Sequence, residues 1–338
     1  MSTLSKARIT AIGTYVPEAI MTNEDLERLV DTNDEWIIQR TGIRTRHIVA
    51  SDEFTSHLCI RAAEKLRDTY SVSLDDVDMI IATTTTPDFA FPSVSCLVQD
   101  HLGIQETGAI DLNATCAGFS YALHVANGLI TSGLHKKILV VAGETMSKIT
   151  DYRDRSTCIL FGDGAGAALV EYDPNPDPDH AGFESFTMGT QGSGGIHVYR
   201  SGLSSQLDQT PLEGDGRIVQ NGREVFKWAV RTVTAGINVL LDQANLERDQ
   251  IDWFVPHSAN LRMIESICEK AEFPLSKTLQ SVTEMGNTSS ASIPLALQAG
   301  IDHQQLKYGD RILIYGFGSG LTHAGLIIRW DVPDLKNN

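Results

Sequence analysis

The sequence predicts an α/β protein built from two similar halves that meet at a pseudo-twofold axis. Three segments recur 174 residues later in the chain: 75–81 matches 249–255, 113–117 matches 287–291, and 136–140 matches 310–314. The outer two pairs read as strands, and the middle pair is rich in small residues. Repeated α/β units bury their sheets between helical layers and carry sites at strand ends, so we expect halves 1–174 and 175–338.

The first half alternates strands and helices. Thr22 and the acidic residues after it are typical of a capped helix start, and Gly42 is expected to end the next helix. The run Met79–Ala82 indicates a strand buried on both faces, and 172–179, rich in Pro and Asp, indicates a surface connection. The predicted elements are strand 8–15, helix starts at 22 and 34, helix 56–70, strand 78–83, loop 86–92 and strand 138–142.

Cys116 lies where an expected buried strand becomes the first turn of a helix. Residues 109–121 begin as an apolar run, pass through small polar residues and end in a helix-like segment. Free N–H groups and the positive end of the helix dipole meet at such a point, where they favour a thiolate and can hold an oxyanion. An inert, buried cysteine is the alternative, but small neighbours on both sides favour an approachable sulfur.

The two copies differ where chemistry would require it. Cys116 of the first half corresponds to Ser290, and His257, at the end of a second-half strand, corresponds to Thr83. Asn287 opens the loop equivalent to the one that carries Cys116. We therefore expect Cys116, His257 and Asn287 to share one cleft.

Composition excludes several classes of protein. The 338 residues carry a net charge of −16, which argues against general nucleic-acid binding. The five cysteines are scattered without a C-x-x-C pair, so neither a disulfide framework nor a metal site is expected. Residues 1–11 lack a signal-peptide layout and no apolar run approaches the ~20 residues of a membrane span, which predicts a cytoplasmic protein that binds no membrane. The glycines of 162–166 precede a strand-like run, so they are a weak dinucleotide motif.

Seven segments in order resemble the β-ketoacyl-acyl-carrier-protein synthase III family, the initiating condensing enzymes of type II fatty-acid synthesis in the thiolase superfamily. The resemblance covers essentially the whole chain and implies a thiolase-like α-β-α-β-α sandwich of duplicated halves. The segments are Asp-Thr-Asn-Asp-Glu-Trp at 31–36, 40–43, Asn-Ala-Thr-Cys-Ala-Gly at 113–118, 161–166, Val-Pro-His-Ser-Ala-Asn-Leu-Arg at 255–262, 285–289, and Gly-Phe-Gly-Ser-Gly at 316–320.

The resemblance implies that Cys116 accepts an acyl group and that His257 and Asn287 serve decarboxylation. Acyl transfer between thiol carriers needs a soft nucleophile that is also a good leaving group, as a thiolate is. Neutral His and Asn N–H donors stabilise the enolate left when CO2 departs from a malonyl thioester. The N–H groups of Cys116 and Ser319 are implied as the oxyanion hole, although many relatives have Gly or Ala in place of the serine.

The same resemblance implies binding residues along a coenzyme A channel. Trp36 and Arg155 are expected to sandwich the adenine; from the residues alone, Trp36 is equally well explained as a packed helix aromatic. Phe91 is expected to cross a dimer interface and close the partner's acyl pocket, and ordinary core is its alternative. The remaining residues are Thr32 and Arg40 near the nucleotide, Gly222 and Asn260 along the pantetheine, and Phe161 and Phe317 in the acyl pocket.

Basic residues every four positions predict one basic helix face at Arg223, Lys227 and Arg231. With Arg262, which matches the family's carrier-docking arginine, this face is a candidate docking patch for an acidic acyl carrier protein. A solvated helix face is the alternative. Some relatives have Asn and Gln at the positions where this chain has Arg223 and Ser258, two departures from the family's pattern beside the channel.

These inferences together predict a homodimeric acyltransferase that needs no cofactor. It is expected to take a short acyl-CoA primer onto Cys116 and condense it with malonyl-acyl carrier protein, giving 3-oxoacyl-acyl carrier protein, CO2 and CoA. The alternatives are a condensing enzyme of secondary metabolism, a thiol hydrolase or thioesterase, and a non-catalytic carrier-binding protein. A hydrolase would use its histidine as a general base oriented by Asp or Asn.

Overall fold

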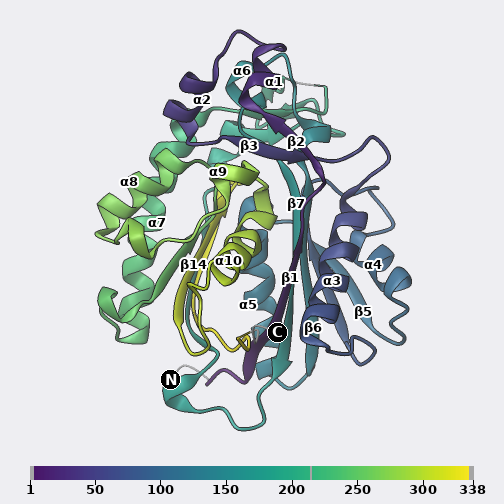
Figure 1. Cartoon of the computed structure of the whole chain (residues 1–338), viewed down its shortest axis with the longest axis vertical. Coiled ribbons are helices and arrows are strands. Elements are labelled where there is room, and N and C mark those ends of the chain that lie inside the picture. Colours follow the sequence, from purple (N-terminus) through teal and green to yellow (C-terminus); the bar gives the residue numbers. More distant parts are fainter. Residues whose placement is uncertain (1–3, 214, 335–338) are drawn as a thin grey trace.

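The computed structural model describes residues 4–213 and 215–334, which form two β-sheets with helices between them and on both outer faces (Figure 1). The first sheet consists of β1 (Ala7–Tyr15), β7 (Asp163–Tyr172), β6 (Lys137–Thr145), β4 (Met79–Thr83) and β5 (Gly108–Leu112), in that spatial order. The second consists of β13 (Trp253–Pro256), β14 (Arg311–Gly318), β15 (Thr322–Arg329) and β8 (Phe183–Thr190), in that order.

The helices form three layers around these sheets (Figure 1). Two helices, α5 (Gly118–Thr131) and α10 (Ser292–Asp302), contact both sheets and form the central layer. The outer face of the first sheet is covered by α3 (Thr55–Tyr70) and α4 (Val94–Leu102), and that of the second by α7 (Gly222–Ala244), which packs against α8 (Leu261–Ala271). The predicted α-β-α-β-α sandwich is therefore confirmed.

Short elements surround the upper ends of the sheets in Figure 1. The helices among them are α1 (Asn23–Glu27), α2 (Asp34–Thr41), α6 (Arg155–Cys158) and α9 (Val282–Met285). The short strand pairs are β2 (Ala19–Thr22) with β3 (Thr45–Ile48), β9 (Val198–Arg200) with β12 (Ile218–Gln220), and β10 (Gln206–Leu207) with β11 (Thr210–Pro211).

The ends of two predicted helices are confirmed with their physical cause. The Thr22 hydroxyl accepts the Asp25 N–H while the Asp25 carboxylate accepts the Thr22 N–H, a complete capping box at the start of α1. Gly42 ends α2 with φ at 75°, a left-handed conformation that favours glycine.

The repeat seen in the sequence is also present in the structure. Equivalent strands of the two halves begin 174 residues apart. Strand β4 begins at Met79 and β13 at Trp253, and β6 begins at Lys137 and β14 at Arg311. The connection predicted at 172–179 joins β7 to β8 and thus the first sheet to the second. A division into 1–174 and 175–338 stays our proposal, supported by the fact that neither sheet draws a strand from the other half.

The expectation of a buried strand before Cys116 is wrong. Strand β5 pairs only with β4, at the edge of the first sheet, and most of its residues are at least partly exposed. The side chain of Ile110 is 42% exposed within the single chain. The outer edge of β5 has no neighbouring strand in the described part of the chain, and an exposed apolar side chain on such an edge favours contact with another chain.

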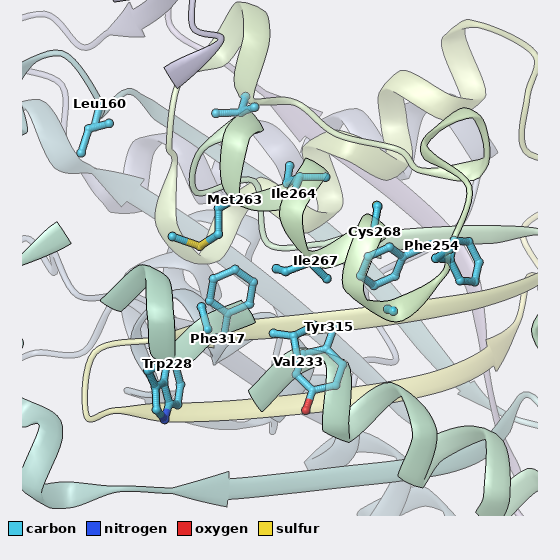
Figure 2. Packing of buried hydrophobic residues seen from close by; sticks show 14 of the residues in the cluster. Leu160, Trp228, Val233, Phe254, Met263, Ile264, Ile267, Cys268, Tyr315 and Phe317 are labelled. Atoms are coloured by element: carbon cyan, nitrogen blue, oxygen red, sulfur yellow. The ribbon is translucent and has the colours of Figure 1, made fainter. Parts of the chain in front are cut away.

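Three clusters of buried apolar side chains hold the layers together. One lies under α3 and α4, one between the sheets around α5 and α10, and the third under α7 and α8. Figure 2 shows part of the third cluster, where Val233, Ile264 and Tyr315 lie between α7, α8 and β14. One end of this cluster reaches Met263 and Phe317, so the packed core continues directly into the wall of the cavity described next.

Candidate active site

Cys116 lies in a 3-10 turn, η1 (Thr115–Ala117), between β5 and α5. Thr115 has φ at 50°, a left-handed conformation that costs energy for a non-glycine residue, and its hydroxyl donates to the Ser319 carbonyl oxygen at 3.1 Å. A Cβ added to Gly318 would lie 2.9 Å from the Cys116 nitrogen, so β14 passes closely against the turn. The end of β14 therefore sets where the cysteine sits.

The resting form of Cys116 is the thiol. Burial, which removes water from around the sulfur, raises the pKa of Cys116 to about 12. The hydrogen bond with Ser289 lowers this pKa, and the negative charge of Glu144 raises it further. The expectation that the strand-to-helix position favours a thiolate is therefore wrong for the free protein, because loss of hydration outweighs the helix terminus.

His257 follows β13 and is buried. Burial lowers its pKa to about 3, so the imidazole is neutral at pH 7, as expected. Its Nδ1 lies 2.7 Å from the Ser292 hydroxyl, which also accepts the Ser258 N–H at 3.2 Å. A hydroxyl that accepts one N–H can still donate its own proton, and donation to Nδ1 places the histidine proton on Nε2.

Asn287 is fixed through its backbone and its side-chain oxygen. Its N–H donates to the Leu160 carbonyl oxygen at 2.8 Å, and its own carbonyl oxygen accepts the Gly162 N–H at 3.1 Å. The side-chain oxygen accepts the Ser289 N–H at 2.9 Å. This leaves the NH2 group of the amide as the part that can donate to a ligand.

A single cavity of about 520 Å³ brings together most of the predicted site residues. The cavity lies where the two halves meet, because Cys116 comes from the first half while His257 and Asn287 come from the second. The predicted residues on its wall are Trp36, Arg40, Cys116, Arg155, Phe161, Gly222, His257, Asn260, Asn287, Phe317 and Ser319.

An aromatic and cationic cluster lies at one part of this cavity wall. The Arg155 guanidinium lies 4.9 Å from the centre of the Trp36 ring, and that of Arg40 lies 5.6 Å from it. Arg155 also donates to the Asp31 carbonyl oxygen at 2.9 Å. The direct contact between Trp36 and Arg155 leaves no space for a base between them, so a sandwiched adenine requires Arg155 to swing away.

Five predicted residues do not line the cavity: Thr32, Phe91, Arg223, Lys227 and Arg262. The Thr32 hydroxyl is buried and has no hydrogen-bond partner within the described part of the chain. The side chain of Phe91 is 85% exposed, so it does not belong to the hydrophobic core of a single chain. Arg223 and Lys227 lie exposed on α7.

Arg262 is engaged inside the molecule. Its guanidinium donates to the carbonyl oxygens of Ile38 and Gln39 near the end of α2 and pairs with Glu265 at 2.8 Å. The side chain is 42% exposed, so one face of it remains open to solvent. Arg262 therefore has a structural role, because its hydrogen bonds join α8 to α2.

Sequence reasoning missed three residues that hydrogen-bond to the site residues directly or through one hydroxyl. Ser289 accepts the Cys116 thiol proton at 3.4 Å, Ser292 contacts His257, and Glu144 accepts the Ser289 hydroxyl at 3.0 Å. Ser289 lies inside the repeat segment 287–291, and Glu144 follows the predicted strand 138–142 at its carboxyl end. A search of strand ends for buried acids could have found Glu144, but not its link to the cysteine.

Among residues 4–213 and 215–334, no group of three or more His, Cys, Asp or Glu side chains is arranged to hold a metal ion. No described helix combines the length and apolarity that crossing a membrane requires.

Comparison with known proteins identifies relatives over nearly the whole chain. A family model described as 3-oxoacyl-[acyl-carrier-protein (ACP)] synthase III matches residues 110–192, and the model of its C-terminal part matches 241–330. The chain is 61% identical to a β-ketoacyl-[acyl-carrier-protein] synthase III 2 of Halalkalibacterium halodurans over 99% of both chains. It is also 61% identical to the protein of that name in Bacillus anthracis, over 97% of this chain and 99% of that one.

A solved structure agrees with the fold. The chain superposes on the β-ketoacyl-[acyl carrier protein] synthase III of Thermus thermophilus with a TM-score of 0.91 and 42% identity. The match covers 96% of this chain and 99% of that one.

Proposed function

Because the chain belongs to the β-ketoacyl-[acyl-carrier-protein] synthase III family, we propose that it carries out that family's condensation. A short acyl group moves from acyl-CoA to Cys116 and is then joined to malonyl-acyl carrier protein. The products are CoA, CO2 and 3-oxoacyl-acyl carrier protein. The observation that carries the proposal is that Cys116, His257 and Asn287 line one cavity.

In the first half-reaction the Cys116 sulfur attacks the thioester carbonyl of acyl-CoA. The oxygen of the tetrahedral intermediate is held by the N–H groups of Cys116 and Ser319. The Ser319 hydroxyl donates to the Val198 carbonyl oxygen, which turns this side chain away from an oxyanion and leaves its backbone for that task. CoA leaves as its sulfur takes a proton, and the acyl group lies between Phe161 and Phe317.

In the second half-reaction CO2 leaves the malonyl group and an enolate forms on the thioester oxygen. The neutral His257, with its proton on Nε2, and the Asn287 NH2 group donate to that oxygen. A neutral imidazole also has no charge that would hold the malonyl carboxylate in place. The enolate carbon then attacks the acyl-Cys116 carbonyl, and the cysteine leaves as product forms.

The coenzyme A moiety follows the cavity from Cys116 towards Trp36 and Arg40. Pantetheine lies along Gly222 and Asn260, while Arg155 moves off Trp36 to admit the adenine. Asn260 is held for this role because its side-chain oxygen accepts the Arg262 N–H at 2.8 Å. Thr32 supports the same region from outside the cavity.

The acyl carrier protein docks on the exposed basic residues Arg223 and Lys227, with Arg262 at the edge of the patch. Such charges raise the association rate of an acidic partner even when the whole chain is acidic. Lys227 also pairs with Glu224 at 2.8 Å, so this cation is partly neutralised in the free protein.

The enzyme acts as a homodimer in the cytoplasm. Exposed apolar side chains at Phe89, Phe91 and Ile110, together with the unpaired edge of β5, support an interface. Phe91 would then reach the partner subunit's acyl pocket. The reaction needs no metal or organic cofactor, since the thioester substrates supply the activated acyl groups.

The direct test is product analysis with purified protein, acetyl-CoA and malonyl-acyl carrier protein. The proposal predicts acetoacetyl-acyl carrier protein together with equal amounts of CO2 and CoA. Free acetate without the 3-oxoacyl product would instead identify a hydrolase. Repeating the assay with isobutyryl- and isovaleryl-CoA determines whether straight or branched primers are preferred.

A further inference from the structure

A fully buried carboxylate lies next to the nucleophile without any assigned role. Glu144 is near the end of β6 and has no exposed surface. One of its oxygens accepts the Thr84, Thr85 and Thr86 hydroxyls at 3.2, 2.9 and 2.8 Å, together with the Thr85 N–H at 3.0 Å. All of these donors are neutral, so the carboxylate is held by hydrogen bonds without a balancing cation among the described ion pairs.

The other oxygen of Glu144 connects to Cys116 through one hydroxyl. Ser289 donates to this oxygen at 3.0 Å and in turn accepts the Cys116 thiol proton at 3.4 Å. The Ser289 proton thus points to Glu144, and a lone pair of the Ser289 oxygen faces the thiol. Ser290 makes the same kind of bond to this oxygen at 2.9 Å, but its other hydrogen bond goes to the Thr83 carbonyl oxygen and not to Cys116, and it does not line the cavity.

We propose that Glu144 takes up the Cys116 proton through Ser289 during acyl transfer. As the sulfur bonds to the thioester carbon, its proton passes to the Ser289 oxygen and the Ser289 proton passes to Glu144. When the carbon–sulfur bond to CoA breaks, the two protons return in the opposite sense and the departing CoA sulfur receives one. The net change is one proton moved from the cysteine sulfur to the CoA sulfur, with Glu144 ionised again.

The charge balance of the buried site favours this route. Loss of the thiol proton to solvent would place a thiolate beside an ionised Glu144, and two like charges in a poorly hydrated site repel strongly. Transfer to Glu144 keeps a single negative charge, which moves from the carboxylate to the oxygen of the tetrahedral intermediate as the sulfur bonds to carbon. His257 does not serve as the acceptor, because its Nε2 carries a proton and its Nδ1 faces Ser292. Glu144 is thus a positioning residue that acts on the nucleophile through Ser289.

A purely structural Glu144 predicts the opposite result in one experiment. If the carboxylate only repels the thiolate, Glu144→Gln removes that repulsion and makes Cys116 more reactive. If the carboxylate takes the proton, the same change makes Cys116 less reactive. The sign of the change therefore separates the two accounts. A general loss of stability exposes buried thiols and speeds their alkylation, so it does not imitate the decrease that the proposal predicts.

The first test is alkylation of Cys116 by iodoacetamide at pH 7, followed by peptide-resolved mass spectrometry. It needs no substrate, so its outcome stands even if the proposed condensation is refuted. We expect Glu144→Gln to slow alkylation of Cys116 by roughly 10²-fold, a typical general-base contribution. The exposed Cys96 is the internal control and should react equally in every variant. Faster or unchanged alkylation of Cys116 overturns the proposal.

The second test compares Ser289→Ala with its matched control Ser290→Ala. Both variants remove one hydrogen bond to the same Glu144 oxygen, but only the first breaks the link to Cys116. We expect acylation by acetyl-CoA to slow much more in Ser289→Ala, and the Ser289→Ala/Glu144→Gln double variant to be no slower than the slower single variant, since both lie on one route. Equal losses in the two serine variants, or additive losses in the double variant, overturn it. This comparison also decides the matter should Glu144→Gln fail to fold.

Discussion

Burial shifts the two central side chains towards their neutral forms. It raises the pKa of Cys116 to about 12 and lowers that of His257 to about 3, so the resting site holds a thiol and an imidazole. Cysteine hydrolases depend on a thiolate–imidazolium pair. No hydrogen bond joins Cys116 to His257 within the described residues, and the histidine Nδ1 faces a serine hydroxyl. The residue-scale chemistry therefore favours a histidine that donates to an enolate.

Replacing either decarboxylation residue should separate the two half-reactions. We expect His257→Ala and Asn287→Ala to lower condensation by roughly 10²–10³-fold, the usual cost of losing an oxyanion donor. Acylation of Cys116 should change little, because the hydrogen bond described for the sulfur goes to Ser289 and not to either of these side chains. Single-turnover experiments on each half-reaction measure the rate of acylation and the rate of condensation separately. Condensation at the wild-type rate in either variant contradicts the roles given.

The neutral, buried His257 also makes stability depend on pH. Its pKa is about 3 in the folded chain and 6.5 in the unfolded one, so only the unfolded state takes up this proton between those values. Stability therefore falls as the pH drops from 6.5 towards 3. We expect wild type to lose about 2 kcal/mol more than His257→Ala between pH 7 and pH 5. Urea unfolding at fixed protein concentration measures this difference; equal losses would show that the histidine is protonated in the folded chain.

At the scale of elements, the junction of α2 and α8 joins two predicted sites. Arg262 of α8 donates to carbonyl oxygens at the end of α2, which also carries Trp36 and Arg40. Substitution of Arg262 therefore disturbs the proposed nucleotide site as well as any carrier contact. Arg223 and Lys227 of α7 make cleaner probes of docking, because they are exposed and do not line the cavity.

Charge reversal on α7 should weaken use of the carrier protein alone. We expect Arg223→Glu/Lys227→Glu to raise KM for malonyl-acyl carrier protein by about threefold to fivefold at low salt, since exposed ion pairs contribute about 0.2–1 kcal/mol each. KM for acetyl-CoA should not change, and the effect should shrink at high salt. Lys65→Glu on α3, across the molecule in Figure 1, is the control. A rise of equal size in that control contradicts the docking surface.

Local patterns predicted the elements well where their causes are local. The Thr22 capping box, the end of α2 at Gly42 and the turn after β5 all follow from neighbours in sequence. The exposure of β5 could not be predicted from neighbouring residues in the sequence. Whether an apolar strand is central or at an edge depends on which strands pair with it, and β5 has a neighbour on one side only.

At the scale of the whole molecule, duplication explains how the site is assembled. The 174-residue repeat predicted that the turn carrying Cys116 and the loop carrying Asn287 would be equivalent, and the left-handed residues Thr115 and Ser289 occupy the same position in each copy. What the repeat could not predict are contacts between the copies. The link from Cys116 through Ser289 to Glu144 joins residues far apart in sequence, and it forms only once both sheets have packed.

The exposed edge of the first sheet makes a prediction about assembly. Because we propose a homodimer that forms along the β5 edge, we expect Ile110→Lys to give a monomer, since a lysine buried in that interface would lose its hydration. Sedimentation velocity measures the mass, and Leu203→Lys, at another exposed apolar residue, should remain dimeric. An unchanged dimer for Ile110→Lys would place the interface elsewhere.

The most direct measurement of the central claim follows one acyl group through the protein. Wild type is incubated with acetyl-CoA, digested and analysed by mass spectrometry, before and after malonyl-acyl carrier protein is added. The account predicts one acetyl group on the peptide that contains Cys116, and its quantitative transfer to the carrier as a 3-oxoacyl product. An acetyl group on any other residue, or an acetyl-Cys116 that malonyl-acyl carrier protein fails to discharge, contradicts it.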